Sequence, residues 1–408
     1  MRRASKFFQL LFIAIAFYAC KSQKQLTSQS INQQKADSIA LAEKFGEIDS
    51  STFMVDKELE VKVDSAAIKD SLESLAKLFE KDTLLIIGVG DIMMGTNFPK
   101  VDYLPPNKGR NLLDGVRNEL KSADLTFGNH EGVILNDGGE QKECRNPDVC
   151  YLFRSPEYIA QNLVDAGFDV VSLANNHAGD FGDTGRVNTM RVLDSLGIHY
   201  GGLLMKPYAS FEIDGTTYGF AAFSPNSGTQ SIIEIKAAKE IISHLDSLND
   251  IVIVSFHGGA EGKDHQHVTK ETETYYGENR GNVYRFSHEL IDAGADIIFG
   301  HGPHVTRAVE VYKKRFIAYS LGNFCTYARF NLKGPNGVAP IVKVYTNQNG
   351  EFLKGTIIPV KQIGSGIPVV DEEKVVIRYV RELTEADFPE SEIIIDDEGN
   401  INYIQSEI

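Results

Sequence analysis

Short apolar runs that end in glycine and polar residues recur along the middle of the chain. The first runs from Thr83 to Val89 and leads into Gly90-Asp91. A continuous apolar run of this length, bounded by turn residues, predicts a strand that is buried on both faces. The same pattern returns at 123–127, 169–173, 250–256, 296–299 and 316–321. The sequence therefore predicts a set of buried strands that deliver polar residues at their carboxyl ends.

Stretches with helical periodicity lie between these runs, at 155–167, 184–196, 234–248 and 283–294. Gly167 and Gly197 stand where the C-caps of two of these helices are expected. Residues 205–224 are typical of a hairpin that turns at Asp214-Gly215. Strands that alternate with helices predict an α/β fold, in which the carboxyl ends of the strands carry the functional site.

The N-terminus predicts export. A basic head of Arg2, Arg3 and Lys6 precedes an apolar run from Phe7 to Tyr18. This run is shorter than the roughly 20 residues that a membrane-spanning helix needs, and it is typical of a signal-peptide core. Ala19-Cys20 closes the run and resembles a bacterial lipoprotein signal, with Cys20 as the lipidated first residue. An uncleaved N-terminal anchor is the alternative.

These patterns divide the chain into four segments. Residues 1–19 are expected to be a lipoprotein signal peptide. Residues 20–82 are expected to be a tether that includes a short amphipathic helix over 64–80. Residues 83–362 form the predicted α/β domain. Residues 363–408 are acidic and lose the pattern, so we expect a C-terminal extension of strands and loops, without chemistry.

Composition and charge narrow the class of protein. The chain has 408 residues, of which 42% are hydrophobic, so general disorder is excluded. Its formal net charge of -15 and the lack of a basic stripe exclude general binding to nucleic acid. Cys144 and Cys150 flank a short polar loop, where they form either a disulfide in an oxidising compartment or two free thiols. Cys325 is expected to be buried and unpaired.

Metal-ligating side chains follow five of the apolar runs. They are Asp91, Glu131, Asn176-His177, His257 and His301/His304. Carboxylate, amide and imidazole donors without thiolates suit Zn, Mn, Fe or Mg. Each piece alone also has a structural reading, as a turn, a helix-capping Asn or a hydrogen-bonded core His. Their shared position after runs of strand length favours a metal or catalytic site over those readings.

Several longer motifs carry a family resemblance over about residues 83–330. The chain resembles the CapA-type poly-γ-glutamate capsule biosynthesis family, which is related to the calcineurin-like metallophosphoesterases. The motifs are GVGDIMMG (88–95), ADLTFGNHEGVI (123–134), GFDVVSLANNHAGDFG (167–182), VIVSFHGGAE (252–261), DAGADIIFGHGPHV (292–305) and AYSLGNF (318–324).

The resemblance implies a four-layer αββα sandwich with one or two divalent ions at the strand ends. It implies that Asp91, Glu131, Asn176, His257, His301 and His304 are metal ligands. It further implies that His177 protonates a leaving group or steadies the transition state, and Asp180 would orient His177. The chain departs from the metallophosphoesterase pattern at Asp91-Ile92-Met93, where those enzymes have Asp-x-His. Two residues, and not one, separate His301 from His304.

Two functions follow as expectations. The first is an exported hydrolase, tethered to a bacterial membrane by lipid on Cys20, that acts on an anionic envelope or capsule polymer or its precursor. The second is a non-catalytic component of a capsule synthesis machine that binds polymer or a membrane synthase. Both place the protein in the cell envelope, on the periplasmic or outer-surface side, and neither involves nucleic acid.

Overall fold

The computed structural model describes residues 83–144, 150–391 and 393–403. The predicted signal peptide, the tether and the helix over 64–80 lie outside the described residues. Of the helices within those ranges, none has the length and apolar character needed to cross a bilayer.

The first of two large sheets has ten strands in the described part of the chain. Eight follow the order β19-β20-β17-β16-β1-β2-β5-β6, while β15 pairs with β1 and β18 with β17. Parallel pairing joins β1, β2, β5 and β6, and antiparallel pairing adds β16 and β17. The strands are β1 (Leu84–Met93), β2 (Leu125–His130), β5 (Val170–Ser172), β6 (His199–Gly201), β15 (Asn323–Thr326), β16 (Val338–Thr346), β17 (Phe352–Ile363), β18 (Ile367–Val370), β19 (Ile393–Ile395) and β20 (Asn400–Tyr403).

The second sheet has six strands in the order β13-β14-β12-β9-β8-β7. They are β7 (Tyr208–Ile213), β8 (Thr216–Phe223), β9 (Ile251–His257), β12 (Ile297–His301), β13 (Val309–Tyr312) and β14 (Arg315–Ala318). Two short ribbons lie outside the large sheets, formed by β3 (Val133–Ile134) with β4 (Arg154–Ser155) and by β10 (Thr274–Tyr275) with β11 (Glu278–Asn279).

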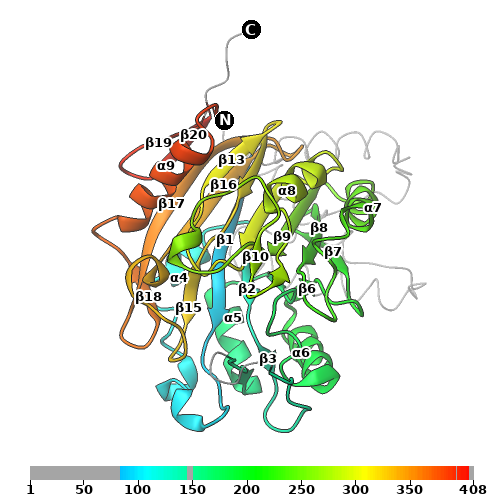
Figure 1. Cartoon of the computed structure of the whole chain (residues 1–408), viewed down its shortest axis with the longest axis vertical. Helices are drawn as coiled ribbons and strands as arrows, with labels where there is room; N and C mark the ends of the chain where they lie inside the picture. Colours follow the sequence, from blue (N-terminus) through cyan, green and yellow to red (C-terminus); the bar gives the residue numbers. More distant parts are fainter. Residues whose placement is uncertain (1–82, 145–149, 392, 404–408) are drawn as a thin grey trace, which may run out of the picture. The chain divides into compact units, whose positions relative to one another are not determined.

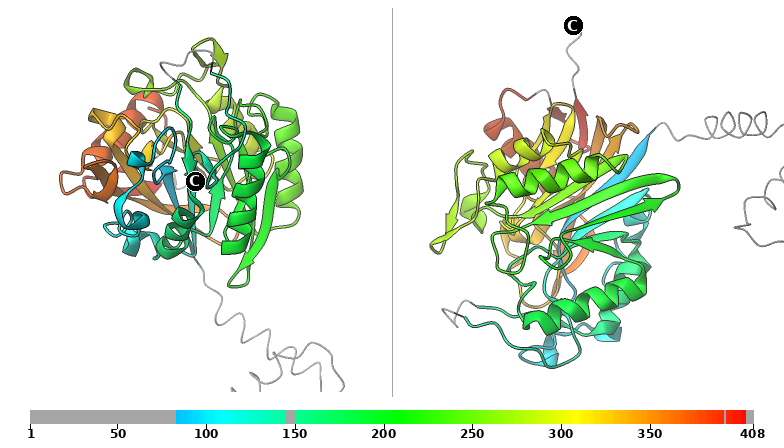
Figure 2. Two further views of the ribbon diagram at one scale, coloured as in Figure 1. Left: turned by 90° about the horizontal axis from the view of Figure 1, so that it is seen from below. Right: turned by 90° about the vertical axis from the view of Figure 1, so that its right-hand side faces the viewer.

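Helices cover the outer faces of the two sheets (Figures 1 and 2). Apolar residues of α4 (Arg117–Leu120), α5 (Gln161–Ala166) and α6 (Gly182–Leu196) share a buried cluster with the outward residues of β1 and β5. A second cluster joins α7 (Ile235–Asp246) and α8 (Val283–Ile291) to the second sheet. Short 3-10 helices occur at Val101–Tyr103, Pro106–Gly109, Glu157–Ala160, Lys263–His265 and Gly334–Gly337.

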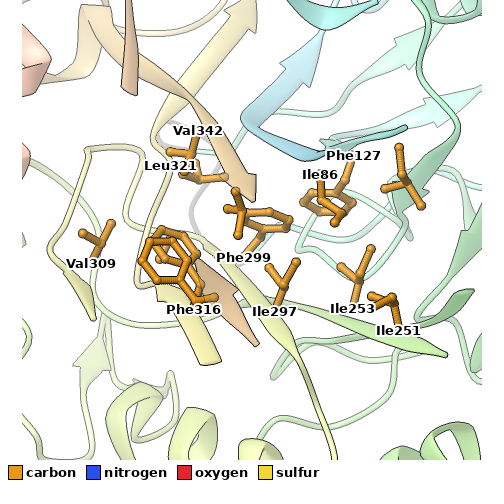
Figure 3. Packing of buried hydrophobic residues seen from close by; sticks show 14 of the residues in the cluster. Ile86, Phe127, Ile251, Ile253, Ile297, Phe299, Val309, Phe316, Leu321 and Val342 are labelled. Carbon is orange, nitrogen blue, oxygen red and sulfur yellow. The ribbon is translucent and has the colours of Figure 1, made fainter. Parts of the chain in front are cut away.

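A continuous apolar core fills the space between the two sheets (Figure 3). The ring of Phe127 from β2 stacks on that of Phe299 from β12, with centroids 5.3 Å apart. Gly88 of β1 leaves room for Phe299, since a Cβ on Gly88 would lie 2.6 Å from Cδ1 of that ring. Burying one such aromatic side chain contributes about 1.5–3 kcal/mol, so these contacts hold the sheets together. The predicted four-layer arrangement is confirmed.

Most elements predicted from apolar periodicity are present, with shifted ends. Each predicted strand overlaps an observed one, and β1 continues four residues beyond Val89, to Met93. Gly167 and Gly197 have φ values of 85° and 71° and cap α5 and α6, as predicted. The predicted hairpin is formed by β7 and β8.

The chain beyond residue 362 differs from the prediction of strands and loops. It contains the helix α9 (Val375–Asp387) besides β18, β19 and β20. Val376, Ile377 and Val380 of α9 are buried in the core between the sheets, and β20 pairs with β17 of the first sheet. The helix was not predicted because acidic residues interrupt the apolar pattern of this segment, although the inner face of the helix is apolar. The strands β15, β16 and β17 were also not predicted.

Candidate metal centre

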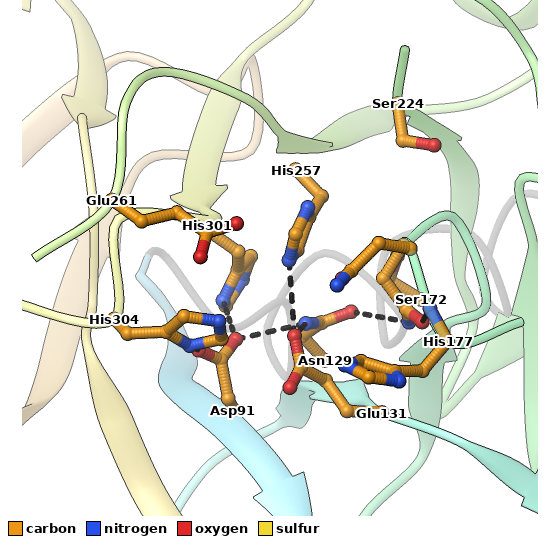
Figure 4. A network of polar contacts seen from close by, with 12 residues as sticks. Asp91, Asn129, Glu131, Ser172, His177, Ser224, His257, Glu261, His301 and His304 are labelled. Carbon is orange, nitrogen blue, oxygen red and sulfur yellow. Dashed lines mark hydrogen bonds and ion pairs between the residues drawn. The ribbon is translucent and has the colours of Figure 1, made fainter. Parts of the chain in front are cut away.

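Strand register brings the predicted ligands together at one edge of the two sheets. In the first sheet Asp91 of β1 lies beside Asn129 of β2 and Asn323 of β15. In the second sheet His301 of β12 lies beside His257 of β9. Because both sheets end their parallel strands at this edge, residues far apart in sequence face one another across the interface (Figure 4).

Irregular pairing sets the position of Asp91 within β1. The register of β1 shifts between Gly88 and Asp91 on one side and between Asp91 and Ile92 on the other. Such bulges bend a strand and re-aim its side chains. Gly90 lets β1 approach the backbone at Gly322, whose carbonyl oxygen accepts a 2.8 Å hydrogen bond from the Asp91 amide.

Gly90→Ala is expected to destabilise the fold by about 1–3 kcal/mol or more, because an added Cβ collides with the backbone oxygens of Leu321 and Gly322. Urea unfolding followed by circular dichroism measures the change. The matched control is Gly219→Ala in β8, where the nearest atom to the added Cβ is the side-chain amide nitrogen of Asn249, at 3.0 Å. Equal losses in the two variants would contradict a special role for the contact at Gly90.

The carboxylate of Asp91 is the centre of a buried polar network. Its Oδ1 accepts a 2.8 Å hydrogen bond from Asn129 and lies 3.2 Å from Nδ1 of His301. Its Oδ2 lies 2.9 Å from Nδ1 of His304. The same nitrogen of His304 is 3.1 Å from Oδ1 of Asn323. Residues of β1 and β15 therefore both contact His304 in the loop after β12, and Asp91 of β1 also contacts His301 at the end of β12.

Glu131, His257 and His304 form a second group within this network. One ligand atom from each lies within 4.8 Å of the other two, which is close enough for a shared metal ion. Oε1 of Glu131 is 3.0 Å from Nε2 of His257. His304 follows the Gly302-Pro303 turn and has a φ of 57°, a left-handed conformation that is uncommon outside glycine.

Unpartnered buried atoms test whether these residues fit a metal ion. In the described part of the chain, Oε2 of Glu131, Oδ1 of Asn176 and Nε2 of His301 are buried without a hydrogen-bond partner. Buried polar atoms are almost always paired, so these three atoms are available to an ordered water molecule or an ion. Carboxylate, amide and imidazole donors suit Mn, Zn, Fe or Mg. The residues therefore fit a divalent cation.

The electrostatics of the cluster also favour a cation. Burial raises the pKa of Glu131 to about 7, and the charge of Asp91 acts in the same direction. Burial lowers the pKa of His304, but Glu131 and the hydrogen bond to Asp91 outweigh it and raise that pKa to about 10. Burial would raise the pKa of Asp91, yet hydrogen bonds from His301 and His304 hold it well below its usual range. The two buried carboxylates of Asp91 and Glu131 thus lie close together and would both be stabilised by a nearby cation.

His177 and Asp180 form a hydrogen-bonded pair beside the cluster. Nδ1 of His177 is 2.8 Å from Oδ2 of Asp180, so Nε2 is left for a reacting group. The backbone amide of Phe153 donates to the same Oδ2 at 2.7 Å, and the Phe153 ring centroid lies 4.3 Å from that of His177. The side chain of Asn175 accepts from the His177 amide and donates to the carbonyl of His130. Asn175 thereby ties the His177 loop to β2.

A cavity of about 640 Å³ with a mixed polar and apolar lining reaches the proposed centre at Asn176. Asn175 and Asn176 line it from the His177 loop, and Glu261 and Arg280 line it from the loops after β9 and β11. Other lining residues include Lys142, Arg186, Tyr275 and Tyr276. Arg280 is buried and its Nη2 lies 3.1 Å from Glu261. The cavity offers hydrogen-bond donors and acceptors of both charges to a ligand that extends from the centre.

Contacts join Asp91, Glu131, His257, His301 and His304 in one network, and Asn175 connects the His177–Asp180 pair to it. The described contact of Asn176 is that of its carbonyl with Lys142.

Three further residues lie in or beside the network and were not predicted. Asn129 and Asn323 hydrogen-bond within the network of Asp91 and His304, and Glu261 lies next to His301 and His304 (Figure 4). Asn129 and Asn323 follow or end apolar runs, which is the signal that could have identified them.

The remaining histidines lie outside the network. His130 is buried, and burial lowers its pKa to about 4, which makes it a neutral core residue. His267 bonds to Asp387 at 2.7 Å, and the carbonyl of His265 accepts from Arg307. His199 stacks on Phe211, and His288 bonds to Glu310. None of these side chains has a described contact with Asp91, Glu131, His257, His301 or His304.

Of the two alternatives for Cys144 and Cys150, a disulfide or two free thiols, the structure has the disulfide. Cys325 of β15 is buried and free, as expected.

Comparisons with known proteins give one family. A family model described as "Bacterial capsule synthesis protein PGA_cap" matches residues 85–328. The "PGA biosynthesis protein CapA" of Bacillus subtilis (strain 168) is 31% identical over 265 residues, which are 61% of this chain and 64% of that protein. The "Capsule biosynthesis protein CapA" of Bacillus anthracis is 28% identical over 261 residues, which are 60% of each chain. The chain thus spans less than two thirds of the length of these relatives.

Solved structures resemble the chain more distantly. The calcineurin-like phosphoesterase YfkN from Bacillus subtilis has a TM-score of 0.38 and 13% identity, and the match covers 74% of this chain and 97% of that one. A hypothetical protein from Thermus thermophilus has a TM-score of 0.40 and 17% identity, over 68% of this chain and 99% of that one.

Proposed function

The chain belongs to the bacterial capsule synthesis protein family, and from this premise we propose that it is an exported, membrane-tethered and metal-dependent hydrolase. Its substrate would be an anionic polymer of the capsule or cell envelope, such as poly-γ-glutamate, or a precursor of that polymer. The observation that carries the proposal is the convergence of Glu131, His257 and His304 within 4.8 Å, next to the His177–Asp180 pair.

The metal would be held by side chains from both sheets. Asp91 and Glu131 supply carboxylates, and Asn176, His257, His301 and His304 supply the neutral donors. The ion held there would supply Lewis-acid chemistry, by polarising a substrate oxygen and activating a water molecule. Asn129 and Asn323 hold Asp91 and His304 in place before the ion arrives, so little side-chain entropy is lost on binding.

His177 would act as the general acid in this mechanism. Asp180 accepts the hydrogen bond of Nδ1–H and so fixes the tautomer and direction of the ring, which leaves Nε2 to hold the proton that a leaving group requires. The pair is nearly closed off from solvent, with 7% exposure of His177 and none of Asp180. The buried position keeps bulk water from competing for that proton.

The cavity beside the centre supports a polymer substrate. It is lined by three basic side chains (Lys142, Arg186 and Arg280), by four glutamates (Glu140, Glu143, Glu261 and Glu278) and by amides and tyrosine hydroxyls. The basic and amide groups can contact the carboxylates and amides of a bound chain, while the glutamates limit how many carboxylates fit beside them. Export rests on the signal-like segment before Cys20, which lies outside the described residues. Lipid on Cys20 would keep the enzyme at the membrane where such polymers emerge.

A non-catalytic role in binding or exporting the polymer, beside a membrane synthase, is the second candidate. The same cavity favours it, because the cavity could hold polymer without cutting it. The two candidates differ in cells: a binding component tolerates His177→Ala but loses polymer production when Cys20 is removed. A hydrolase loses its effect on the polymer with either change.

Divalent metal is expected to stabilise the metal-free protein. A ligand that binds only the folded state at a hundred times its dissociation constant adds about 2.7 kcal/mol to the free energy of unfolding. Chelator-treated protein should therefore melt at a clearly higher temperature after Mn or Zn is restored, measured by calorimetry. The double variant His257→Ala/His304→Ala is the control and should not respond. An equal response in this variant would place the metal elsewhere.

Hydrolysis is tested on the purified metal-loaded protein with two substrate classes, a phosphodiester and an oligomer of γ-linked glutamate. Release of phosphate or of shorter oligomers, dependent on metal and His177, is expected for one of them. A protein that binds metal but cleaves neither class would favour the binding role.

A further inference from the structure

Two segments that are joined by the Cys144–Cys150 disulfide both contact the His177–Asp180 pair. On the first segment, the Lys142 amide donates to the carbonyl of Asp180 at 3.0 Å, two residues before Cys144. On the second, the Phe153 amide donates to Oδ2 of Asp180 at 2.7 Å, three residues after Cys150. The disulfide therefore links two backbone donors that fix the backbone and the side chain of one aspartate.

The side chains of the same two residues reach the other parts of the site. Nζ of Lys142 donates to the carbonyl of Asn176 at 2.8 Å and lies 3.7 Å from Oδ1 of Asp180. The ring of Phe153 packs on the imidazole of His177 and on Phe330, which in turn lies against His304. Neither Lys142 nor Phe153 is a metal ligand, and both act through residues that line the centre.

The disulfide also has an apolar anchor. Cys144 and Cys150 pack against a small buried cluster of Val133, Leu135, Leu152 and Phe181, which is separate from the larger cores. Phe181 is the residue next to Asp180 and stands at the N-cap of α6. The disulfide thus joins the two segments to each other, and apolar packing holds it against the turn that carries Asp180.

We propose that Lys142 and Phe153 are positioning residues for His177 and Asn176, and that the Cys144–Cys150 disulfide keeps both in place. Without the link, each segment is fixed only by its own hydrogen bonds and apolar packing, and the direction of the imidazole toward the centre becomes less defined. A displacement of about 1 Å at a reacting group can lower a rate by about a hundredfold. The device suits an oxidising compartment, where the link persists. The rate effect rests on the proposed function, whereas the positioning of His177 does not.

The first test needs no activity. In the metal-free protein, hydrogen exchange of the Phe153 amide and the nitrogen NMR signals of the His177 imidazole report the contacts of Asp180 directly. Cys144→Ser/Cys150→Ser is expected to speed exchange of that amide at least tenfold and to give His177 a mixture of tautomers. Lys142→Met is expected to change the His177 signals while the disulfide remains. Lys313→Met, which removes the exposed 2.6 Å ion pair with Asp292, is the matched control and should change neither readout.

The second test uses the metal-loaded enzyme. The Cys144→Ser/Cys150→Ser variant is expected to lose about 10–100-fold in kcat, while KM and metal content stay unchanged. This is the range found when residues that orient the groups of a metal site are replaced. Lys142→Arg should restore most of the kcat that Lys142→Met loses. If the Cys144→Ser/Cys150→Ser variant does not fold, the His177 signals and kcat are measured on Lys142→Met and Lys142→Arg instead.

Unchanged exchange of the Phe153 amide and an unchanged His177 spectrum in the variants would overturn the proposal, whether or not any substrate is cleaved. Loss of metal content together with kcat would overturn it as well, since the disulfide would then support the ligands and not the imidazole. A protein with no measurable hydrolysis but with the expected spectral changes would leave the positioning intact and reject the hydrolase.

Discussion

Asp91→Ala protein is expected to purify with its metal content at background and to hydrolyse substrate about a thousandfold more slowly. Asp91 contacts Asn129, His301 and His304 with its two oxygens and is fully buried. Its removal therefore takes away a proposed ligand and the acceptor that orients two others. Stabilisation by a metal is worth several kcal/mol in a transition state, and about 4 kcal/mol corresponds to a factor of a thousand. Metal analysis by mass spectrometry and initial rates measure the two effects.

The control for this change is another buried aspartate. Asp371 is 1% exposed and accepts from the backbone amide of Val375 at the start of α9, away from the centre. Asp371→Ala is expected to lower the free energy of unfolding while metal content and kcat of the folded fraction stay normal. Normal metal content in Asp91→Ala would contradict the ligand assignment and leave Asp91 a structural residue.

His177→Ala is expected to keep its metal and lose activity by about 10²–10⁴-fold, the range typical of a general acid. The side chain bonds to Asp180 and packs on Phe153, and no residue of the Asp91 network depends on it. The loss should therefore appear in kcat, while calorimetric stabilisation by Mn or Zn remains. Comparison of kcat, KM and metal content separates this outcome from that of Asp91→Ala.

An exposed histidine gives the matched control for His177. His244 lies on α7 next to the ring of Tyr208, outside the network of the centre. His244→Ala should retain full activity. Asp180→Asn should cost less than His177→Ala, because the imidazole remains but its tautomer is less well held. Unaltered hydrolysis in His177→Ala would assign the proton transfer to another group and favour the binding role of the protein.

The alternation of apolar runs with helical periodicity made most of the α/β core predictable. The strand that ends just after Asp91 and the strand that ends at His257 are buried on both faces, so their sequences are almost wholly apolar and stand out. Gly167 and Gly197 could be placed as helix caps, because the left-handed conformation at a helix end favours glycine.

Elements with mixed patterns could not be predicted in this way. The strand β17 (Phe352–Ile363) mixes buried with exposed or partly exposed residues and contains Gly355 and Pro359. Helix α9 has charged residues on its exposed face and buries only one apolar stripe. Their contribution depends on packing against β16 and the core between the sheets, which tertiary structure alone supplies.

The amino-acid sequence by itself determined which donors are available and that each stands at the end of a strand, since apolar runs and the residues after them are local features. Only the tertiary structure decided which donors meet. Bulges beside Asp91 set its position in the first sheet, and the register of β12 with β9 places His301 beside His257 in the second sheet. The contacts of Asn129 with Asp91, of Asn323 with His304 and of Lys142 with Asn176 join residues 38, 19 and 34 positions apart. No local pattern encodes such contacts, because they depend on how separate segments pack.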